Sequence, residues 1–304
     1  MSERLLEIEV LRYDPEQDSE PHFQSYEVPC QNDWAILDGL NYIKENLDTT
    51  LAFRWSCHMM VCGSCGMMVN GEPALTCKTF VRDLPDKVRI EPLENFPIER
   101  DLVVVLDDVM EKLQRAKPYI IRKDPPPEDK EHIQPRSALY KFKQYTMCVN
   151  CMCCYAACPQ YALDKDFIGP AVLALAHRYN IDSRDQGKSE RLNILADHDG
   201  VWNCSFVGAC SEVCPQHIDI SDEVIEARSG FSGLYGEHGY QKYLARKVLS
   251  RPELLGAARV LGKTAAHMLF KRLPPASGLR LRLALFAQTP APSELLVSPL
   301  KQER

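Results

Sequence analysis

Residues 57–77 read CHMMVCGSCGMMVNGEPALTC, residues 148–159 read CVNCMCCYAACP, and residues 204–215 read CSFVGACSEVCP. These segments hold all but one of the thirteen cysteines in a chain of 304 residues. The N-terminus leads directly into an alternating pattern, without the apolar core of a signal peptide, so we expect the protein to reside in a reducing cytoplasm. Clustered cysteines in that compartment bind metal more often than they form disulfides.

The first segment has the spacing C-x4-C-x2-C with a distant fourth cysteine, which is typical of a plant-type [2Fe–2S] site. Gly63 and Gly66 give the backbone freedom beside the ligands, and the Ser64 hydroxyl can donate a hydrogen bond to sulfur. A zinc site is the alternative, but it usually pairs two short knuckles, and this segment has one. We expect four ligands here: Cys57, Cys62, Cys65 and Cys77.

The second segment is the C-x2-C-x2-C-x3-C-P run of bacterial ferredoxins, whose fourth cysteine crosses to another cluster. The third segment repeats that run with Val207 in the place of Cys151. The crossing rule predicts a [4Fe–4S] cluster on Cys148, Cys151, Cys154 and Cys214. The three remaining thiols are one ligand short, which favours a [3Fe–4S] cluster on Cys158, Cys204 and Cys210. A non-cysteine fourth ligand or a solvent-exposed iron would be the alternatives.

Two cysteines are not assigned to a cluster. We expect Cys30 and Cys153 to be buried as small hydrophobic residues. His58 and His217 flank ligands, and we expect them to lie around the clusters or in solvent. The eight histidines show no spacing that indicates a separate metal site.

Hydrophobic periodicity predicts a small mixed sheet with one helix in the first third of the chain. Alternation around Leu6–Val10 and near Tyr26–Val28 predicts a hairpin, and Asp33 is expected to cap a helix whose apolar residues run from Ile36 to Leu47. The remaining strands are expected at Met67–Val69, at Ala74–Cys77 after an Asn70-Gly71 turn, and around Val88–Leu93.

The rest of the chain has a mainly helical pattern. We expect a helix over residues 102–117 with Leu102 and Leu106 on its apolar face, then a proline-rich linker over residues 122–136. Pro170 suits the first turn of a further helix, and the two later cysteine groups are expected at helix ends and turns. An amphipathic helix or helical pair is predicted over residues 234–273, and the last thirty residues are expected to be poorly ordered.

Composition is that of a globular protein, with 45% hydrophobic and 26% charged residues and no apolar run long enough to span a membrane. Charge is uneven: residues 240–304 carry twelve Lys or Arg against three Glu, a net charge of +9. Because the whole chain carries −6, the residues before Tyr240 carry −15. A basic end of this kind can meet anionic lipid, nucleic acid or an acidic partner, or can simply be solvated.

With these motifs in place, residues 5–230 resemble the iron–sulfur subunit of the succinate dehydrogenase and quinol:fumarate reductase family. The resemblance lies in RWSCHMMVCGSCGMMVNG, CKTF, NFPIERDLVVVL, CVNCMCCYAACPQ, FIGPAVLALAHRYNIDSRDQGK and CSFVGACSEVCP. It implies an α+β fold with a β-grasp plant-type ferredoxin domain (1–105) and an all-α ferredoxin domain (106–232). The charge and periodicity of the remaining residues predict a basic helical extension (233–304) beyond the resemblance.

The resemblance also implies partners. These are a flavoprotein subunit that carries covalent FAD and binds fumarate, and a membrane anchor that helps to form the quinone site, with no nucleic acid. The expected cluster order places [3Fe–4S] nearest the quinone, [4Fe–4S] next, and [2Fe–2S] nearest the flavin. The subunit would lie peripherally on the cytoplasmic face of the cell membrane, with no catalytic acid or base of its own.

Two features of the resemblance bear on the direction of electron flow. Ubiquinone-linked succinate dehydrogenases tend to carry tryptophan soon after the first CP motif, whereas Pro159 is followed here by Gln160-Tyr161-Ala162-Leu163. Together with NFPIERDLVV, this resembles the menaquinol:fumarate reductase branch. The quinone-proximal positions of that branch correspond to Ser205, Phe206 and Arg228, where relatives carry lysine in place of Arg228 and can carry a polar residue in place of Ile225.

The extension departs from that branch, whose members commonly end soon after residue 240. Contact of this basic segment with the membrane surface, or with partner subunits, is the corresponding hypothesis. A succinate dehydrogenase of the same architecture, a soluble electron carrier without a quinone, and a structural zinc protein are the alternative functions.

Overall fold

The computed structural model describes residues 4–124, 131–221, 224, 227 and 228. All of these lie in the first of the chain's two units, Met1–Phe231, and the second unit is Ser232–Arg304. The predictions for residues 234–273, for the last thirty residues and for the extension 233–304 therefore lie outside the described residues.

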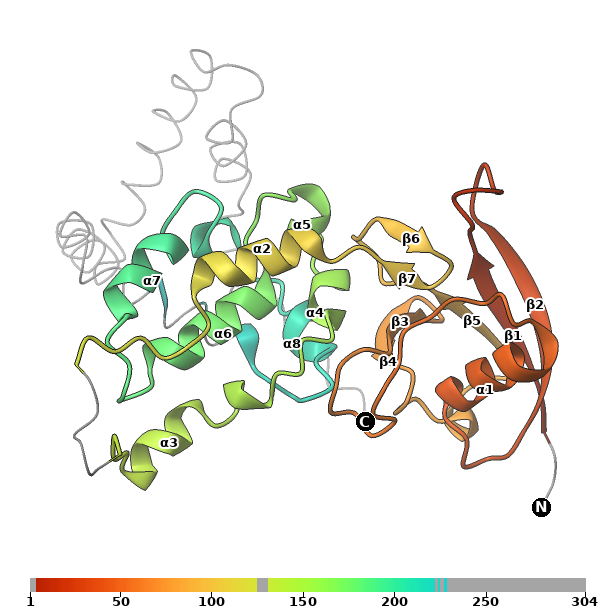
Figure 1. Ribbon diagram of the computed structural model, residues 1–304, viewed down its shortest axis with the longest axis horizontal. Helices are drawn as coiled ribbons and strands as arrows, with labels where there is room; N and C mark the ends of the chain where they lie inside the picture. The colour runs from red at the N-terminus through yellow and green to blue at the C-terminus, as the bar shows by residue number, and fades with distance from the viewer. Residues whose placement is uncertain (1–3, 125–130, 222–223, 225–226, 229–304) are drawn as a thin grey trace, which may run out of the picture. The chain divides into compact units, whose positions relative to one another are not determined.

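The first third of the chain forms the predicted mixed sheet around a hairpin. β1 (Arg4–Arg12) pairs antiparallel with β2 (His22–Cys30), and β5 (Lys87–Glu91) runs parallel to β1 on its other side. β3 (Gly66–Val69) and β4 (Glu72–Leu75) complete the order β2-β1-β5-β3-β4 (Figure 1). This is the expected β-grasp arrangement.

The turn between β3 and β4 matches the expectation from its sequence. Asn70 and Gly71 both have positive φ, 52° and 83°, which a two-residue type I′ hairpin turn requires. A side chain at Gly71 would meet nothing within 4 Å, so the glycine serves the backbone conformation there rather than close packing.

One helix covers the sheet, but it is not capped as predicted. α1 (Ile36–Tyr42) continues into a π-helical turn, η1 (Ile43–Leu47), and Ile36 and Leu40 are fully buried against the strands. The helix begins after Ala35, whose N–H donates to the Asp38 carboxylate at 2.8 Å. The prediction that Asp33 caps the helix is wrong because Asp38, inside the first turn, takes the N–H of the capping residue.

The helix predicted over residues 102–117 is also shorter than expected. α2 covers Asp107–Ala116, whereas Val103–Val104 forms β7, which pairs with β6 (Ile98–Arg100). Leu102 packs in the core of the sheet, not on a helix face. The chain is extended at this point because backbone pairing with β6 replaces the first helical turn.

The second half is built from short helices. These are α3 (Arg136–Phe142), η3 (Tyr145–Met147), α4 (Cys153–Ala156), α5 (Pro159–Leu163), α6 (Pro170–Asn180), α7 (Lys188–Leu195), η4 (Val201–Asn203) and α8 (Ala209–Glu212). The first half contains one further short helix, η2 (Val81–Asp83). Pro170 occupies the first turn of α6, as predicted. In the expected linker, residues 122–124 and 131–135 contain no helix or strand, whereas its last residue, Arg136, already belongs to α3.

Two large cores hold these elements together. One lies between the sheet and α1, and the other joins α2 and α6 with the cysteine-bearing turns. The second core also takes in Met68, Leu93 and Phe96 from the first half, so the two halves are packed on each other. Within the described ranges, no helix has both the length and the apolar character needed to cross a bilayer.

Candidate iron–sulfur cluster sites

The first four predicted ligands gather around the loop that precedes β3. The N–H groups of Met59, Val61 and Cys62 point at the Cys57 sulfur, with nitrogen–sulfur distances of 3.4, 3.3 and 3.3 Å. The Cys57 N–H lies 3.5 Å from the Cys62 sulfur. Backbone donors that converge on sulfur stabilise thiolates, which are the form that binds iron.

The other thiols of this group lie on the buried side. Cys65 and Cys77 pack with Leu37 and Leu75 in a small core. Burial raises the pKa of Cys77 to about 12, and its hydrogen bond to Cys65 acts in the same direction. At Cys62, by contrast, the Ser64 hydroxyl bond is the largest of the effects that lower the thiol pKa, to about 6. Ser64 thus acts on a predicted ligand, and its hydrogen bond to the sulfur of a bound cluster stays a prediction.

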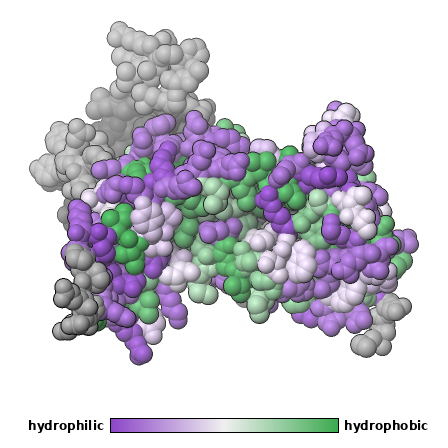
Figure 2. Space-filling model, in the orientation of Figure 1, coloured by the Kyte–Doolittle hydropathy of each residue, from purple (hydrophilic) through white to green (hydrophobic). Residues whose placement is uncertain are grey.

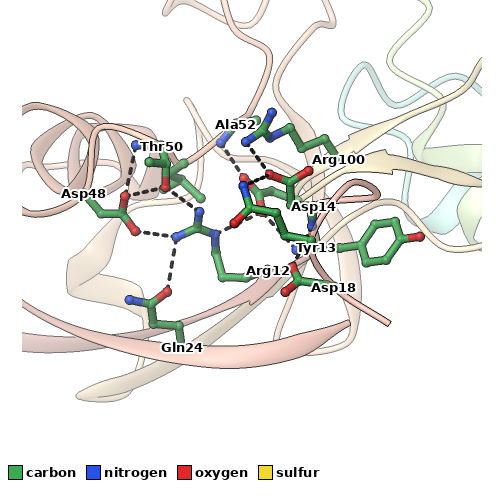
Figure 3. A network of polar contacts seen from close by, with 12 residues as sticks. Arg12, Tyr13, Asp14, Asp18, Gln24, Asp48, Thr50, Ala52 and Arg100 are labelled. Atoms are coloured by element: carbon green, nitrogen blue, oxygen red, sulfur yellow. Dashed lines mark hydrogen bonds and ion pairs between the residues drawn. The ribbon is translucent and has the colours of Figure 1, made fainter. Parts of the chain in front are cut away.

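A buried polar network anchors the segment that leads into this loop (Figure 3). The Arg12 guanidinium donates to Asp48 at 2.5 Å, to Thr50 at 2.8 Å and to Asp101 at 3.0 Å. Asp101 also accepts the N–H of Ala52 at 2.8 Å. Because these bonds tie residues 48–52 to β1, the loop that carries Cys57 starts from a fixed position.

A second group of four thiols lines one cavity. These are the four thiols that the crossing rule selects: Cys148, Cys151, Cys154 and Cys214. The rest of the cavity lining is mostly apolar. Cys154 is buried, and burial raises its pKa well above the ordinary value. A buried thiol of this kind becomes a thiolate only where a cation replaces its proton, so the donor set and its surroundings fit an iron cluster.

The last three thiols also lie near one another. Burial raises the pKa of Cys210 to about 12, and the nearby Cys158 and Cys204 act in the same direction. Tyr161 N–H points at the Cys158 sulfur and Phe206 N–H at the Cys204 sulfur, each at 3.4 Å. The structure therefore brings the eleven predicted ligands together in the three predicted groups.

The backbone confirms the internal repeat on which the role of Val207 rests. η4 follows η3, and α8 follows α4, at the same interval that separates Cys204 from Cys148. The positive φ of Asn150 recurs at Phe206. Val207 thus occupies the backbone position equivalent to Cys151, with a side chain that is 62% exposed and that has no atom able to bind iron.

The predicted quinone-proximal residues lie beside this three-thiol group. Ser205 and Phe206 are exposed and directly follow Cys204. The Arg228 guanidinium donates to the carbonyls of Val201, at 3.0 Å, and Cys204, at 2.7 Å. Its Nε is buried without a hydrogen-bond partner among the described residues.

The two unassigned cysteines differ from each other. Cys30 is buried and donates to the Arg4 carbonyl at 3.3 Å, far in sequence from any ligand, as a small core residue would. Cys153 is also fully buried, but its thiol hydrogen-bonds to Cys151 and is the largest cause that lowers the Cys151 pKa, to about 7. Sequence reasoning missed this contact, and only its position between two ligands hinted at it.

The two histidines beside ligands make local contacts. His58 Nε2 lies 3.1 Å from the Asp38 carboxylate, and its ring meets Trp55 edge-on. The His217 N–H donates to the Cys214 carbonyl at 2.9 Å, and its own carbonyl accepts from Gln144 at 2.8 Å. Both therefore help to hold cluster-bearing loops.

Exposed hydrophobic residues lie next to the predicted ligands, and Met147 directly precedes Cys148. Trp55, Met59 and Val61 flank Cys57, and Trp202 and Phe206 flank Cys204. Figure 2 shows hydrophobic residues grouped near the middle of an otherwise mostly hydrophilic face. Exposed apolar side chains next to functional loops are typical of surfaces that partner subunits cover.

Comparison with known proteins agrees with this geometry. Residues 7–111 match the family described as 2Fe-2S iron-sulfur cluster binding domain, and residues 144–218 match the 4Fe-4S dicluster domain. The fumarate reductase iron-sulfur subunit of Mycobacterium tuberculosis is 56% identical over 221 residues, which cover 72% of this chain and 89% of that protein. This chain belongs to the fumarate reductase and succinate dehydrogenase iron–sulfur subunit family.

A more distant relative agrees with the assignment, and a solved structure agrees with the fold. The succinate dehydrogenase iron-sulfur subunit of Coxiella burnetii is 35% identical over 223 residues, covering 72% of this chain and 94% of that protein. A chain of the Mycobacterium smegmatis Sdh1 complex in the apo form matches with a TM-score of 0.68 and 24% identity, over 77% of this chain and 98% of that one. The predicted family and fold are both confirmed, and the chain is an electron-transfer component of an oxidoreductase.

Proposed function

We propose that this subunit passes electrons from membrane menaquinol to the FAD of a partner flavoprotein, which reduces fumarate to succinate. The observation that carries the direction is the similarity: 56% identity to a fumarate reductase subunit against 35% to a succinate dehydrogenase subunit over the same share of the chain. The runner-up is the same architecture working as a succinate dehydrogenase in the opposite direction.

The three groups of thiols would hold three clusters. Cys57, Cys62, Cys65 and Cys77 would bind [2Fe–2S]; Cys148, Cys151, Cys154 and Cys214 would bind [4Fe–4S]; and Cys158, Cys204 and Cys210 would bind [3Fe–4S]. When bound, such clusters supply one-electron carriers, which suits transfer between a two-electron quinol and a two-electron flavin. The chain's own contribution is ligation, burial and hydrogen bonds to sulfur.

The proposal divides the chain into residues 1–105 for [2Fe–2S], residues 106–232 for the other two clusters, and residues 233–304 as an extension. A flavoprotein would cover the apolar residues around Cys57, and a membrane anchor those around Cys204. The subunit would then lie peripherally on the cytoplasmic face of the cell membrane.

Ser205, Phe206 and Arg228 would lie nearest the quinone. Arg228 is held by the carbonyl of a ligand residue, Cys204, and its guanidinium stands over the Trp202 ring, 5.5 Å from the centroid. The Arg228 Nε, which has no hydrogen-bond partner in the part of the chain that the structure describes, is a donor that a quinone oxygen could satisfy.

Direction can be tested on the complete complex by comparing menaquinol-driven fumarate reduction with succinate-driven quinone reduction. The proposal expects the first rate to exceed the second, and the reverse order would favour the succinate dehydrogenase reading. In Arg228→Gln, the KM for a menaquinol analogue should rise while fumarate reduction by a viologen dye, which bypasses the quinone, stays unchanged. Arg82→Gln, at an exposed position, is the matched control.

A further inference from the structure

The loops that carry the first two groups of thiols meet backbone to backbone. Gly63 lies in the loop of Cys62 and Cys65, and Gly66 begins β3 directly after that loop. The neighbours of both glycines include backbone atoms of Val149 or Cys151. A Cβ built on Gly63 would lie 2.1 Å from the Val149 oxygen, and one built on Gly66 would lie 2.6 Å from the Cys151 oxygen. Real side chains do not approach backbone so closely, so these positions admit only glycine at the present separation.

Further contacts hold the same junction. The Gln216 side chain donates to the Met60 carbonyl at 3.1 Å, joining the segment after Cys214 to the first loop. Cys151 packs against the small core that contains Cys65 and Cys77. Asn95 donates to the carbonyls of Tyr155 and Ala156 at 3.0 and 2.8 Å, which fixes α4 to the first half of the chain.

We propose that Gly63 and Gly66 are spacing positions: the lack of a side chain at both lets the two loops touch, and this contact sets the distance over which an electron passes between the [2Fe–2S] and [4Fe–4S] sites. The inference rests on the ligand assignment of the proposed function and extends it to residues that bind no iron. Both glycines act by positioning, and neither takes part in the redox chemistry.

The geometry ranks the two substitutions. An ordinary van der Waals contact is about 3.4 Å, so Gly66→Ala requires the loops to part by about 0.8 Å at the Cys151 oxygen. Gly63→Ala requires about 1.3 Å at the Val149 oxygen, and it also places alanine at a φ of +72°. Rigid backbone stands on both sides of each contact, so the separation itself must change.

Gly71→Ala is the matched control for backbone strain. Gly71 has a φ of +83°, comparable to that of Gly63, but a side chain there meets nothing within 4 Å. Gly66→Ala is the complementary variant, because it adds the clash at a residue without positive φ. Gln216→Ala loosens the junction without adding volume, and it tests the inference if Gly63→Ala or Gly66→Ala does not assemble.

The experiment uses the assembled complex, fully reduced, with two readouts from EPR. Spin quantitation reports whether both clusters are present, and the relaxation enhancement of the [2Fe–2S] signal by the reduced [4Fe–4S] cluster reports their separation. We expect both clusters in every variant, with relaxation enhancement reduced most in Gly63→Ala, less in Gly66→Ala, detectably in Gln216→Ala, and not at all in Gly71→Ala.

The outcomes separate this inference from the proposed function. Wild-type protein without the two signals would overturn the ligand assignment and the inference together. Intact signals with unchanged relaxation enhancement in Gly63→Ala and Gly66→Ala would overturn the inference alone. If neither glycine variant assembles, an unchanged relaxation enhancement in Gln216→Ala overturns the inference, and a reduced enhancement supports it.

Discussion

Replacing Arg191 with methionine should destabilise the helical half of the protein. The Arg191 side chain is fully buried and forms an ion pair with Asp185, which is 1% exposed. Two guanidinium nitrogens donate to the two Asp185 oxygens at 2.7 and 2.8 Å. The guanidinium also donates to the Lys117 and Tyr119 carbonyls at 2.9 and 2.5 Å.

Asp185 is satisfied from the same region of the chain. It accepts the N–H groups of Ile121, at 2.9 Å, and Gly187, at 2.7 Å. The pair therefore fastens the segment that follows α2 onto the start of α7. Removing the arginine alone leaves the buried Asp185 carboxylate and two partly buried carbonyls without the guanidinium, which costs about 3–5 kcal/mol.

Differential scanning calorimetry of the anaerobic complex at a fixed scan rate would measure the change in the midpoint temperature of unfolding. For a unit of this size, 1 kcal/mol shifts the midpoint by about 2–4 °C, so we expect a decrease on the order of 10 °C. The double variant Asp185→Leu with Arg191→Met should recover part of the loss, because it buries no unpaired charge.

Arg82→Met provides the control for the change of residue type. Arg82 is 52% exposed and lies 3.9 Å from Asp83, a geometry that contributes little to stability. A midpoint for Arg191→Met no lower than that of Arg82→Met would refute the view that this buried pair holds the helical half together.

Three further predictions concern the cluster sites, and a fourth concerns the buried Asp185–Arg191 pair. Val207→Cys should add one iron per chain and replace the three-iron EPR signal with that of a cubane; an unchanged signal and iron content would contradict the repeat argument. Ser64→Ala should lower the midpoint potential of the [2Fe–2S] cluster in a redox titration, because a hydrogen bond to ligand sulfur is lost, and an equal or higher potential would count against it. Cys153→Ala should retain all three clusters but lower the [4Fe–4S] potential, whereas loss of a cluster would make Cys153 a ligand. Burial opposes the charged form of Asp185, but its hydrogen bonds outweigh this and lower its pKa. The stabilisation by the ionised carboxylate is therefore complete above pH ~4 and is lost as the pH falls further. The difference in unfolding midpoint between wild type and the double variant should shrink in acid, and a difference independent of pH would refute this.

Local sequence patterns predicted most of the fold. The β1–β2 hairpin, the Asn70-Gly71 turn and the start of α6 at Pro170 depend on residues close together in the chain. The grouping of the thiols was equally accessible, because spacing and the repeated run carry it. For these features, local geometry and tertiary structure agree.

The errors arose where distant residues decide the local structure. Asp101 accepts hydrogen bonds from Arg12, Tyr13 and Ala52, and the chain beyond it is extended in β7, so the helix predicted from Leu102 begins only at Asp107. No periodicity within residues 102–117 reveals those partners. At Asp33 the error was smaller: two acidic residues stood near the helix start, and the structure uses the second.

Two features of the sites were beyond prediction for the same reason. The sequence suggested that Gly63 and Gly66 provide freedom to wrap a cluster, whereas the structure shows close approach to Val149 and Cys151, which lie far along the chain. The thiol of Cys153 could have pointed towards or away from the ligand beside it. Both depend on how the two halves of the chain pack.

Low-temperature EPR of the anaerobically purified complex, as isolated and after reduction with dithionite, tests the central claim most directly. The ligand assignment predicts an oxidised [3Fe–4S] signal as isolated, and reduced [2Fe–2S] and [4Fe–4S] signals after dithionite. A second reduced cubane, with no three-iron signal in any preparation, would contradict the role assigned to Val207 and weaken the proposed link to the quinone.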